Sequence, residues 1–410
     1  MTASAVQTAL DLTPLAKLRN IQRELNEFFL ERRWEIDLTL VGIISKRHVA
    51  LIGGAGQGKT SVTRSIFSRI ENSNLFHVQM NSFTQPEELH GPMNLTAFRD
   101  RGVLEFNTAG YLPWAHFGYL DEAFKGSSAV LNVMLTLLEE RLFKWTDTDN
   151  IVRMMPVPLI SAILTSNEMP QRESLAFQDR IMAWRLVAPL SRAGMTNLRL
   201  RDREWRRDPE KRVNPFKGTT ISLGELAQIQ SLVHTVTIPG SVMDAWEDIL
   251  TDLQQEELLN LSPRRDLQAQ DLLRAYVVLQ GRMEAMASDL LVMTHALWHD
   301  PDIKVLRKID LIVMKHCHEL LGQCQEAYDA LVDEVQATLT AISSLTNQPA
   351  QRASQLLNGS TKVKAALQKI ESLIKRAQRE GHDISEMNRI LADGKLQHES
   401  ILKAQRAHTW

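Results

Sequence analysis

Apolar and polar positions follow different patterns in the two halves of the chain. In the first half, short apolar runs of strand length, such as residues 48–52 and 117–120, end in glycines or acids and lead into stretches with helical spacing. Strands and helices alternate in this way between about residues 45 and 190. This order predicts an α/β core with a mainly parallel sheet and helices on both faces.

From Leu223 onward every pattern is helical, and the last part of the chain has the spacing of long amphipathic helices. Leu331, Val335 and Leu339 follow one another at intervals of four residues, while Pro349 interrupts the pattern. Such interruptions are typical of turns between helices. We expect two or three long helices that fold back on one another as a hairpin or coiled bundle.

These patterns divide the chain into four parts. We predict an α/β core in residues 1–195, a basic linker in 196–222, a helical lid in 223–310 and a C-terminal helical bundle or coiled extension in 311–410. The linker stands out because residues 198–217 contain eight Lys and Arg residues against four acids, which indicates an exposed segment.

Composition changes this picture little. The chain has 410 residues, of which 44% are hydrophobic, and a formal net charge of −2, so it reads neither as a disordered chain nor as a nucleic-acid binder. Cys317 and Cys324 form no disulfide framework or zinc motif, and we expect both to be buried apolar residues. The sequence shows no targeting signal and no apolar stretch of membrane-spanning length, so we expect a cytoplasmic protein.

A glycine-rich loop carries the clearest chemical signal. Residues 53–60 match G-x-x-x-x-G-K-[ST] in full, after a predicted strand and before a predicted helix. Glycines allow backbone N–H groups to converge on phosphate oxygens, and the helix N-terminus adds a favourable dipole. We therefore predict an ATP site with Lys59 at the β and γ phosphates and the Thr60 hydroxyl on Mg²⁺. The residues expected to contact the nucleotide are Gly53, Gly54, Ala55, Gly56, Gln57, Gly58, Lys59, Thr60 and Ser61.

Polar residues at the ends of two later strands extend this site. Asp121 and Glu122 follow the run 117–120, so they would lie at the carboxyl edge of the sheet, beside the glycine-rich loop. Asp121 would hold Mg²⁺, mostly through water, and Glu122 would orient and polarise the attacking water. Asn167 follows another apolar run and would contact the γ-phosphate and the same water.

Two arginines are candidates for completing the site. Arg180 lies near the end of the α/β core and would reach the nucleotide of a neighbouring subunit as an arginine finger, with a surface salt bridge as the ordinary alternative. Arg264 opens a predicted helix of the lid and would sense the γ-phosphate of the nucleotide that the lid faces. Arg265 could take its place.

These motifs, in this order and spacing, resemble the MoxR branch of the AAA+ ATPases and are most similar to its RavA group, the regulatory ATPase variants. The most specific stretch comprises residues 110–113, 120–125, 127–132 and 139–143. The resemblance covers about residues 15–310. Beyond them the sequence has no strand-rich segment like the small β-rich module of RavA-type chains, and we expect the helical tail to replace it.

The resemblance implies an αβα core, a helical lid and an ATP hydrolase that acts as a protein-remodelling or assembly chaperone. It also implies a hexameric ring, a protein client and a partner with a von Willebrand factor A domain. Two inserts are expected, one at residues 94–110, which alternate weakly and could form a hairpin, and a hairpin at residues 143–158. The first would face the central pore or the client through Phe98, Arg99 and Phe106.

Two other functions remain open from the sequence. The chain could be a nucleotide-gated scaffold whose helical tail holds partners, although the intact Glu122 favours real hydrolysis. It could also remodel nucleic acid through residues 198–217. We do not expect this, because acids are interleaved with the basic residues and aromatic residues are sparse there.

Overall fold

The computed structural model describes residues 13–168, 179–258, 262–297, 302–317, 319–344, 349–379 and 384–406. The chain folds into two compact units. The first comprises residues 1–239, 260–285 and 295–301, and the second comprises residues 240–259, 286–294 and 302–410. Residues 223–310, which we predicted to form the lid, contribute to both units.

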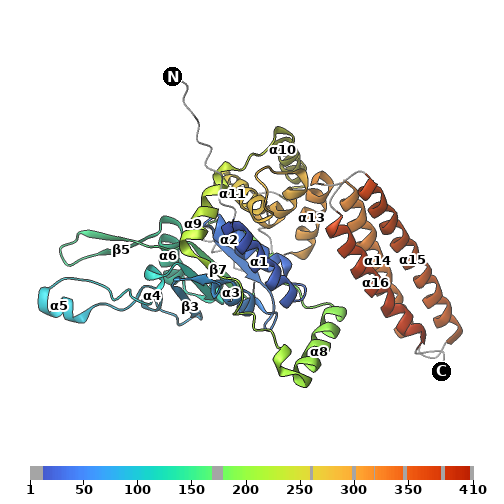
Figure 1. Ribbon diagram of the computed structural model, residues 1–410, viewed down its shortest axis with the longest axis horizontal. Helices are drawn as coiled ribbons and strands as arrows, with labels where there is room; N and C mark the ends of the chain where they lie inside the picture. The colour runs from blue at the N-terminus through green and yellow to red at the C-terminus, as the bar shows by residue number, and fades with distance from the viewer. Residues whose placement is uncertain are drawn as a thin grey trace. The chain divides into compact units, whose positions relative to one another are not determined.

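A five-stranded parallel sheet forms the centre of the first unit (Figure 1). The strands, in the order in which they lie, are β3 (Leu75–Gln79), β4 (Phe117–Asp121), β7 (Ser161–Ser166), β1 (Val49–Ile52) and β8 (Ala183–Leu186). Every neighbouring pair is parallel. The predicted parallel sheet is thus confirmed, and its strands all end at one edge, where ligands of such sheets bind.

Helices and short turns of helix surround this sheet. In the part of the first unit that the structure describes, the helices are α1 (Thr13–Phe28), α2 (Arg33–Ile44), α3 (Lys59–Phe67), α4 (Pro86–His90), α5 (Leu95–Arg101), α6 (Ser128–Leu135), α8 (Arg192–Arg207), α9 (Leu223–Leu232) and α11 (Pro263–Leu279), and α12 (Thr294–Leu297) begins at its boundary. The shorter turns are η1 (Leu112–Trp114), η2 (Ala123–Lys125), the π-helical η3 (Thr136–Glu140), η5 (Pro209–Lys211) and η6 (Val233–Thr235). Both α2 and α3 pack against β7, whose six residues are all buried, and against each other.

The hairpin expected at residues 94–110 is not present, whereas the hairpin expected at 143–158 is. The first segment contains the short helix α5, which begins where the Asn94 side chain accepts a hydrogen bond from the backbone of Ala97 at 3.1 Å. A single antiparallel bridge between Met93 and Phe106 closes the segment. The second segment forms the antiparallel strands β5 (Leu142–Thr146) and β6 (Val152–Pro156).

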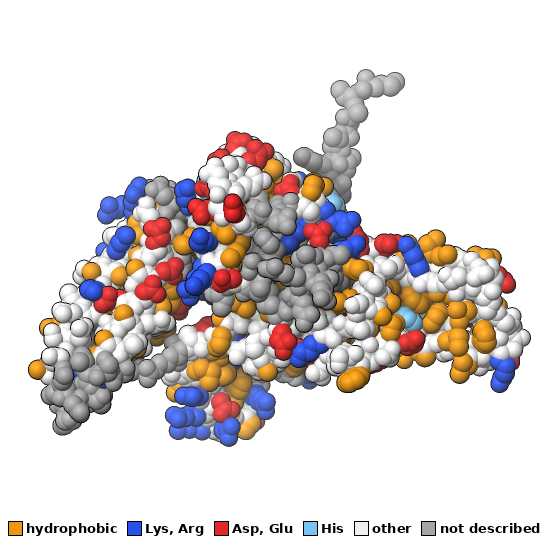
Figure 2. Space-filling view, turned by 180° about the vertical axis from the view of Figure 1, so that it is seen from behind, with side chains coloured by type: hydrophobic (Ala, Val, Ile, Leu, Met, Phe, Trp, Pro, Cys, Tyr) orange, Lys and Arg blue, Asp and Glu red, His pale blue; other side chains and the backbone are white. Residues whose placement is uncertain are grey.

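The basic stretch expected to be a linker is largely exposed, but much of it is helical. Ser191 caps the N-terminus of helix α8, because its hydroxyl accepts a hydrogen bond from the backbone N–H of Gly194 at 3.0 Å. The guanidinium of Arg201 lies 5.0 Å from the ring centroids of both Phe28 and Trp205, which ties the helix to α1. Figure 2 shows Lys and Arg side chains gathered around this protruding helix. After this helix the chain forms the short strand β9 (Ile221–Ser222), which pairs with β2 (Ile70–Glu71).

The second unit is helical throughout its described residues, as expected for the lid and tail. It contains α10 (Gly240–Gln255), η7 (Ala287–Met293), α13 (Ile303–Cys317), α14 (Glu319–Ser344), α15 (Pro349–Arg379) and α16 (Ser385–Arg406). The last three lie side by side as a three-helix bundle, which confirms the predicted long helices (Figure 1). No helix in the described parts of the chain combines the length and apolar character needed to cross a bilayer.

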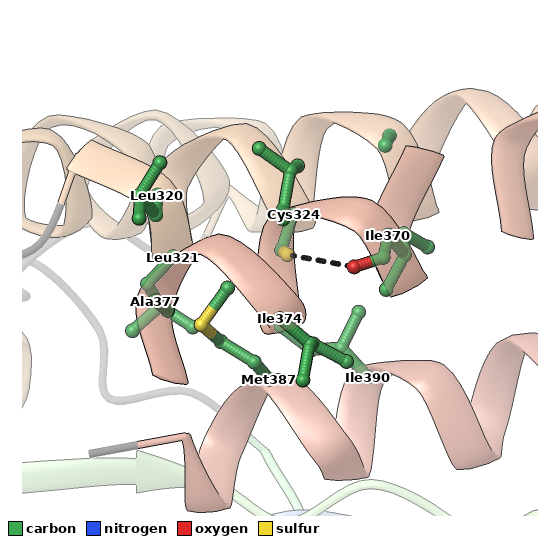
Figure 3. Close-up of a cluster of buried hydrophobic side chains, with 10 residues drawn as sticks. Leu320, Leu321, Cys324, Ile370, Ile374, Ala377, Met387 and Ile390 are labelled. Carbon is green, nitrogen blue, oxygen red and sulfur yellow. Dashed lines mark hydrogen bonds between the residues drawn. The ribbon is translucent and has the colours of Figure 1, made fainter. Parts of the chain in front are cut away.

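An apolar core holds the bundle together at one end (Figure 3). Leu320, Leu321 and Cys324 come from α14, and they meet Ile370, Ile374 and Ala377 of α15 with Met387 and Ile390 of α16. Both cysteines are buried and free, as expected. Burial raises the pKa of both thiols, that of Cys324 to about 11, so they remain protonated and pack as small apolar side chains.

A glycine sets the spacing between two helices of this bundle. A Cβ atom added at Gly359 of α15 would lie 2.2 Å from Thr338 Oγ1 and 2.7 Å from its methyl carbon. Thr338 is itself buried in α14, so its side chain has no space to move into. Although alanine usually favours a helix over glycine, we expect Gly359→Ala to destabilise the bundle by about 1–3 kcal/mol. Amide hydrogen exchange in α14 and α15 would then be faster.

Gly322→Ala is the matched control for this experiment. Gly322 is a glycine of the same bundle and lies in α14. A Cβ atom there would meet its neighbours at 3.5 Å or more, an ordinary contact distance. We expect this variant to exchange at the wild-type rate or more slowly. Equal exchange in both variants would show that the bundle is loose enough to accept a methyl group at Gly359.

Candidate nucleotide-binding site

The glycine-rich loop joins β1 to α3 and leaves open space where a ligand would approach. Gly56 and Gly58 have φ angles of 76° and 84°, which L-residues rarely adopt. A Cβ atom added at either of them, or at Gly54, would meet nothing within 4 Å. Gly53 differs, because a Cβ atom there would lie 2.5 Å from the carbonyl oxygen of Val187. Gly53 thus allows close packing on the end of β8, and the later glycines leave backbone exposed to a ligand.

Lys59 is buried at the start of α3 with its ammonium turned back into the loop. Its Nζ donates to the carbonyl oxygens of Gly53 and Gly54, the latter at 3.0 Å, and to Asn167 Oδ1 at 3.1 Å. Burial lowers the pKa of Lys59, and the nearby carboxylates of Asp121 and Glu122 oppose that effect. Oxygen atoms of the loop and of Asn167 thus hold the ammonium at the glycine-rich loop.

Asn167 connects this lysine to the carboxylate of Glu122. Glu122 follows β4 and has a left-handed backbone conformation with a φ angle of 53°. The Asn167 amide Nδ2 donates to Glu122 Oε1, and its backbone N–H donates to Oε2 at 3.3 Å. Lys125 Nζ lies 3.2 Å from the same oxygen. The structure therefore brings together Lys59, Asn167 and Glu122, which lie far apart in the sequence.

A second group of hydrogen bonds joins the other two predicted residues of this edge, Thr60 and Asp121. The hydroxyl of Tyr119 donates to Thr60 Oγ1 at 2.8 Å and lies 3.1 Å from Thr165 Oγ1. Thr165 donates to Asp121 Oδ1 at 2.6 Å. The sequence motifs did not identify Tyr119 or Thr165, although a tyrosine in an otherwise apolar strand was a visible signal.

Arg32 supports the loop from outside and was also missed. It is buried just before α2, and its Nε donates to the carbonyl oxygen of Gln57 at 2.9 Å. Its Nη2 lies 3.4 Å from the Gln57 side-chain oxygen. No local pattern marks this arginine, because its partner lies 25 residues further along the chain.

The two candidate arginines lie together, away from the glycine-rich loop. Arg180 and Arg264 both form ion pairs with Glu139, the latter at 2.7 Å. A cavity of about 390 Å³ adjoins them, and it is lined by Lys46, Arg47, His48, Leu138, Glu139, Arg141, Arg180, Arg264, Leu267 and Gln268. Residues 46–48 precede β1, whereas the glycine-rich loop follows it, so this basic cavity lies at the opposite edge of the sheet.

Arg264 therefore lies beside Glu139, away from the glycine-rich loop, and its contact with a γ-phosphate stays a prediction. The Ser262 hydroxyl donates to Asp179 Oδ1 at 3.0 Å, which fixes the start of α11 beside the segment that leads into β8. Arg265, the alternative candidate, is buried and donates to the carbonyl oxygen of Ala296 at 2.6 Å. Its guanidinium holds α11 against α12.

The two predicted inserts are attached to each other. Trp145 Nε1 of β5 donates to the Leu104 carbonyl oxygen at 2.8 Å, and the Thr148 hydroxyl donates to that of Gly102 at 2.6 Å. Phe106 packs into an aromatic cluster, with its ring centroid 5.4 Å from that of Phe143. Of the residues expected to face a client, Phe98 is exposed and Arg99 is exposed beside Asp100, whereas Phe106 holds the inserts together.

The exposed apolar side chains of this region lie on both inserts. Leu95 and Phe98 belong to α5, while Ile151, Val152 and Met154 belong to the β5–β6 hairpin or its turn. Figure 2 shows hydrophobic side chains gathered over these inserts.

Comparison with known proteins identifies the family. The sequence model described as "MoxR domain in the MoxR-vWA-beta-propeller ternary systems" matches residues 16–231, and the one described as "AAA lid domain" matches residues 241–309. Two uncharacterized proteins of Methanocaldococcus jannaschii are similar to the chain. One is 34% identical over 313 residues, 75% of this chain and 78% of its own length, and the other is 31% identical over 322 residues, 78% and 81% of the two lengths.

A solved structure shares the fold. A crystal structure from Cytophaga hutchinsonii, described as that of a candidate ATPase, matches with a TM-score of 0.53 and 16% identity, over 74% of this chain and 88% of that chain. The MoxR match covers more than half of the present chain and contains the glycine-rich loop, Asp121, Glu122 and Asn167. The chain belongs to the MoxR family of AAA+ ATPases.

Proposed function

We propose that this protein hydrolyses ATP to ADP and phosphate in a ring of identical subunits and uses the hydrolysis to remodel or assemble another protein, as a RavA-like chaperone. The observation that supports hydrolysis most directly is the hydrogen-bonded series Lys59–Asn167–Glu122 at the glycine-rich loop. It links a cation suited to phosphate oxygens with a carboxylate suited to activating water.

The residues at this edge fit ATP and Mg²⁺. Space is open above Gly54, Gly56 and Gly58, and hydroxyl and carboxylate oxygens are the ligands that Mg²⁺ prefers. The phosphates would bind along residues 53–61, with Lys59 at the β and γ phosphates, and Thr60 and Asp121 would hold the cation. Bound Mg²⁺ would offset the negative charge of the phosphates. Glu122 would take the proton of the attacking water, and Asn167 would orient that water against the γ-phosphate.

We propose that Arg180 and Arg264 act together on the nucleotide of a neighbouring subunit. Their shared partner Glu139 brings both to one cavity, and five of the residues that line this cavity carry a positive charge. In a cyclic ring each subunit presents one surface to a different surface of its neighbour. The basic edge of one sheet would then meet the glycine-rich edge of the next, in a hexamer by family resemblance.

The inserts are the proposed contact with a protein client. The inserts would move as one body, because hydrogen bonds and an aromatic cluster join them. Exposed apolar side chains such as Phe98 and Met154 would contact the client. We propose a partner with a von Willebrand factor A domain, as the description of the matching family suggests, and a cytoplasmic location. The alternative function is a scaffold, in which the three-helix bundle with its own apolar cores would hold partners.

Lys59→Ala is the first test of this function. We expect it to weaken Mg²⁺–ATP binding by about 10- to 100-fold, because it removes charge-assisted hydrogen bonds to the phosphates. Titration with a fluorescent ATP analogue and measurement of phosphate release would show loss of both binding and hydrolysis. Lys211→Ala, which removes a lysine with 60% of its side chain exposed, is the matched control. Equal ATP affinity in the wild type and Lys59→Ala would reject the proposed site.

A further inference from the structure

A tyrosine stands inside the strand that carries the acidic pair. Tyr119 of β4 is fully buried, two residues before Asp121, in a strand position where apolar residues are usual. Its hydroxyl makes a 2.8 Å hydrogen bond to Thr60 and lies 3.1 Å from Thr165, which in turn donates to Asp121. These hydroxyls connect α3, β4 and β7, so they join the two proposed Mg²⁺ ligands, Thr60 and Asp121.

The directions of the hydrogen bonds in this network determine which lone pair of Thr60 Oγ1 stays available. Each hydroxyl has one proton to donate and two lone pairs to accept with. The Thr165 hydroxyl donates its hydrogen bond to Asp121, and the Tyr119 hydroxyl donates its hydrogen bond to Thr60. One lone pair of Thr60 Oγ1 is therefore occupied, and the other is left to bind a cation.

We propose that Tyr119 is a positioning residue that holds the Thr60 hydroxyl, and Asp121 through Thr165, in the orientation that Mg²⁺ requires. This proposal rests on the proposed function, because it needs a Mg²⁺–nucleotide complex at the glycine-rich loop. Mg²⁺ demands near-ideal octahedral geometry. A threonine held in one rotamer before binding satisfies that demand at a lower entropic cost than one that rotates freely.

Tyr119→Phe tests the proposal, because it removes one oxygen atom and keeps the buried ring. The measurement is equilibrium binding of a fluorescent ADP analogue, which is not hydrolysed, as Mg²⁺ is titrated and again in EDTA. We expect the variant to need about 3- to 10-fold more Mg²⁺ for half-maximal enhancement of binding, the effect of one lost hydrogen bond. Affinity in EDTA should match that of the wild type, because the glycine-rich loop itself is unchanged.

Tyr276→Phe serves as the control, since Tyr276 is a buried tyrosine of α11 that lies outside this group of hydroxyls. It should leave the Mg²⁺ requirement as in the wild type. An unchanged Mg²⁺ requirement in Tyr119→Phe would overturn the proposal. So would an equal loss of affinity with Mg²⁺ and in EDTA, because the hydroxyl would then support the loop as a whole. If the wild-type chain bound no nucleotide at all, the proposed function itself would fail.

Discussion

Replacing Glu122 with glutamine is expected to lower the rate of ATP hydrolysis by about 10²- to 10⁴-fold while ATP binding stays close to that of the wild type. The glutamine carbonyl can still accept the hydrogen bond that Asn167 Nδ2 donates to Glu122 Oε1, whereas the weaker 3.3 Å bond from the Asn167 backbone N–H to Oε2 is lost. An amide cannot take a proton from water, so the chemical step loses its base. The Lys59 contacts with the glycine-rich loop do not involve Glu122 and should keep the phosphate site intact.

Two measurements separate binding from chemistry in this variant. Fluorescent ATP titration should give the wild-type affinity, and single-turnover phosphate release should give the reduced rate. Glu140→Gln provides the comparison, because Glu140 has 47% of its side chain exposed and pairs with Lys144, away from the glycine-rich loop. It should hydrolyse ATP like the wild type. A Glu122→Gln protein that hydrolyses ATP at the wild-type rate would show that another group activates the water.

The sequence alone predicted the glycine-rich edge well because its signals are local. The loop at residues 53–60 requires particular residue types at fixed spacing, and apolar runs before Asp121 and Asn167 mark buried strands. Once the strands are parallel, their carboxyl ends must meet at one edge. The proximity of Lys59 to Asn167 and Glu122 then follows from topology and needs no long-range information.

Other features depend on contacts that no local pattern records. Arg180 and Arg264 lie together because both form ion pairs with Glu139. The residues next to these three in the sequence give no sign of this pairing. The sequence did not predict helix α8, because its charged residues resemble those of a linker. The helix is held by Arg201, which packs on Phe28 of α1, far away in the sequence. Helix α5 is short enough that its alternating residues resembled a strand.

Replacing Arg180 with alanine is expected to lower ATP hydrolysis by about 10³-fold or more, because a finger arginine stabilises charge that develops on the phosphates in the transition state. We expect the same direction of effect for Arg264→Ala, because both side chains pair with Glu139 at the same cavity. Steady-state phosphate release should also rise with protein concentration in the wild type, as subunits assemble. Arg206→Ala, which alters an arginine with 79% of its side chain exposed on α8, should change neither property.

A mixture of two inactive variants can show that the arginine acts between subunits. An Arg180→Ala subunit keeps Glu122, and a Glu122→Gln subunit keeps Arg180, so an interface that combines their intact halves should be active. With random mixing of equal amounts, roughly a quarter of the interfaces in a ring have this composition, and about that share of the wild-type rate should return. Mixing Arg180→Ala with the double variant should restore nothing, because no subunit then carries the arginine. Recovery in neither mixture, or a concentration-independent rate that survives Arg180→Ala, would favour a subunit that completes its own site.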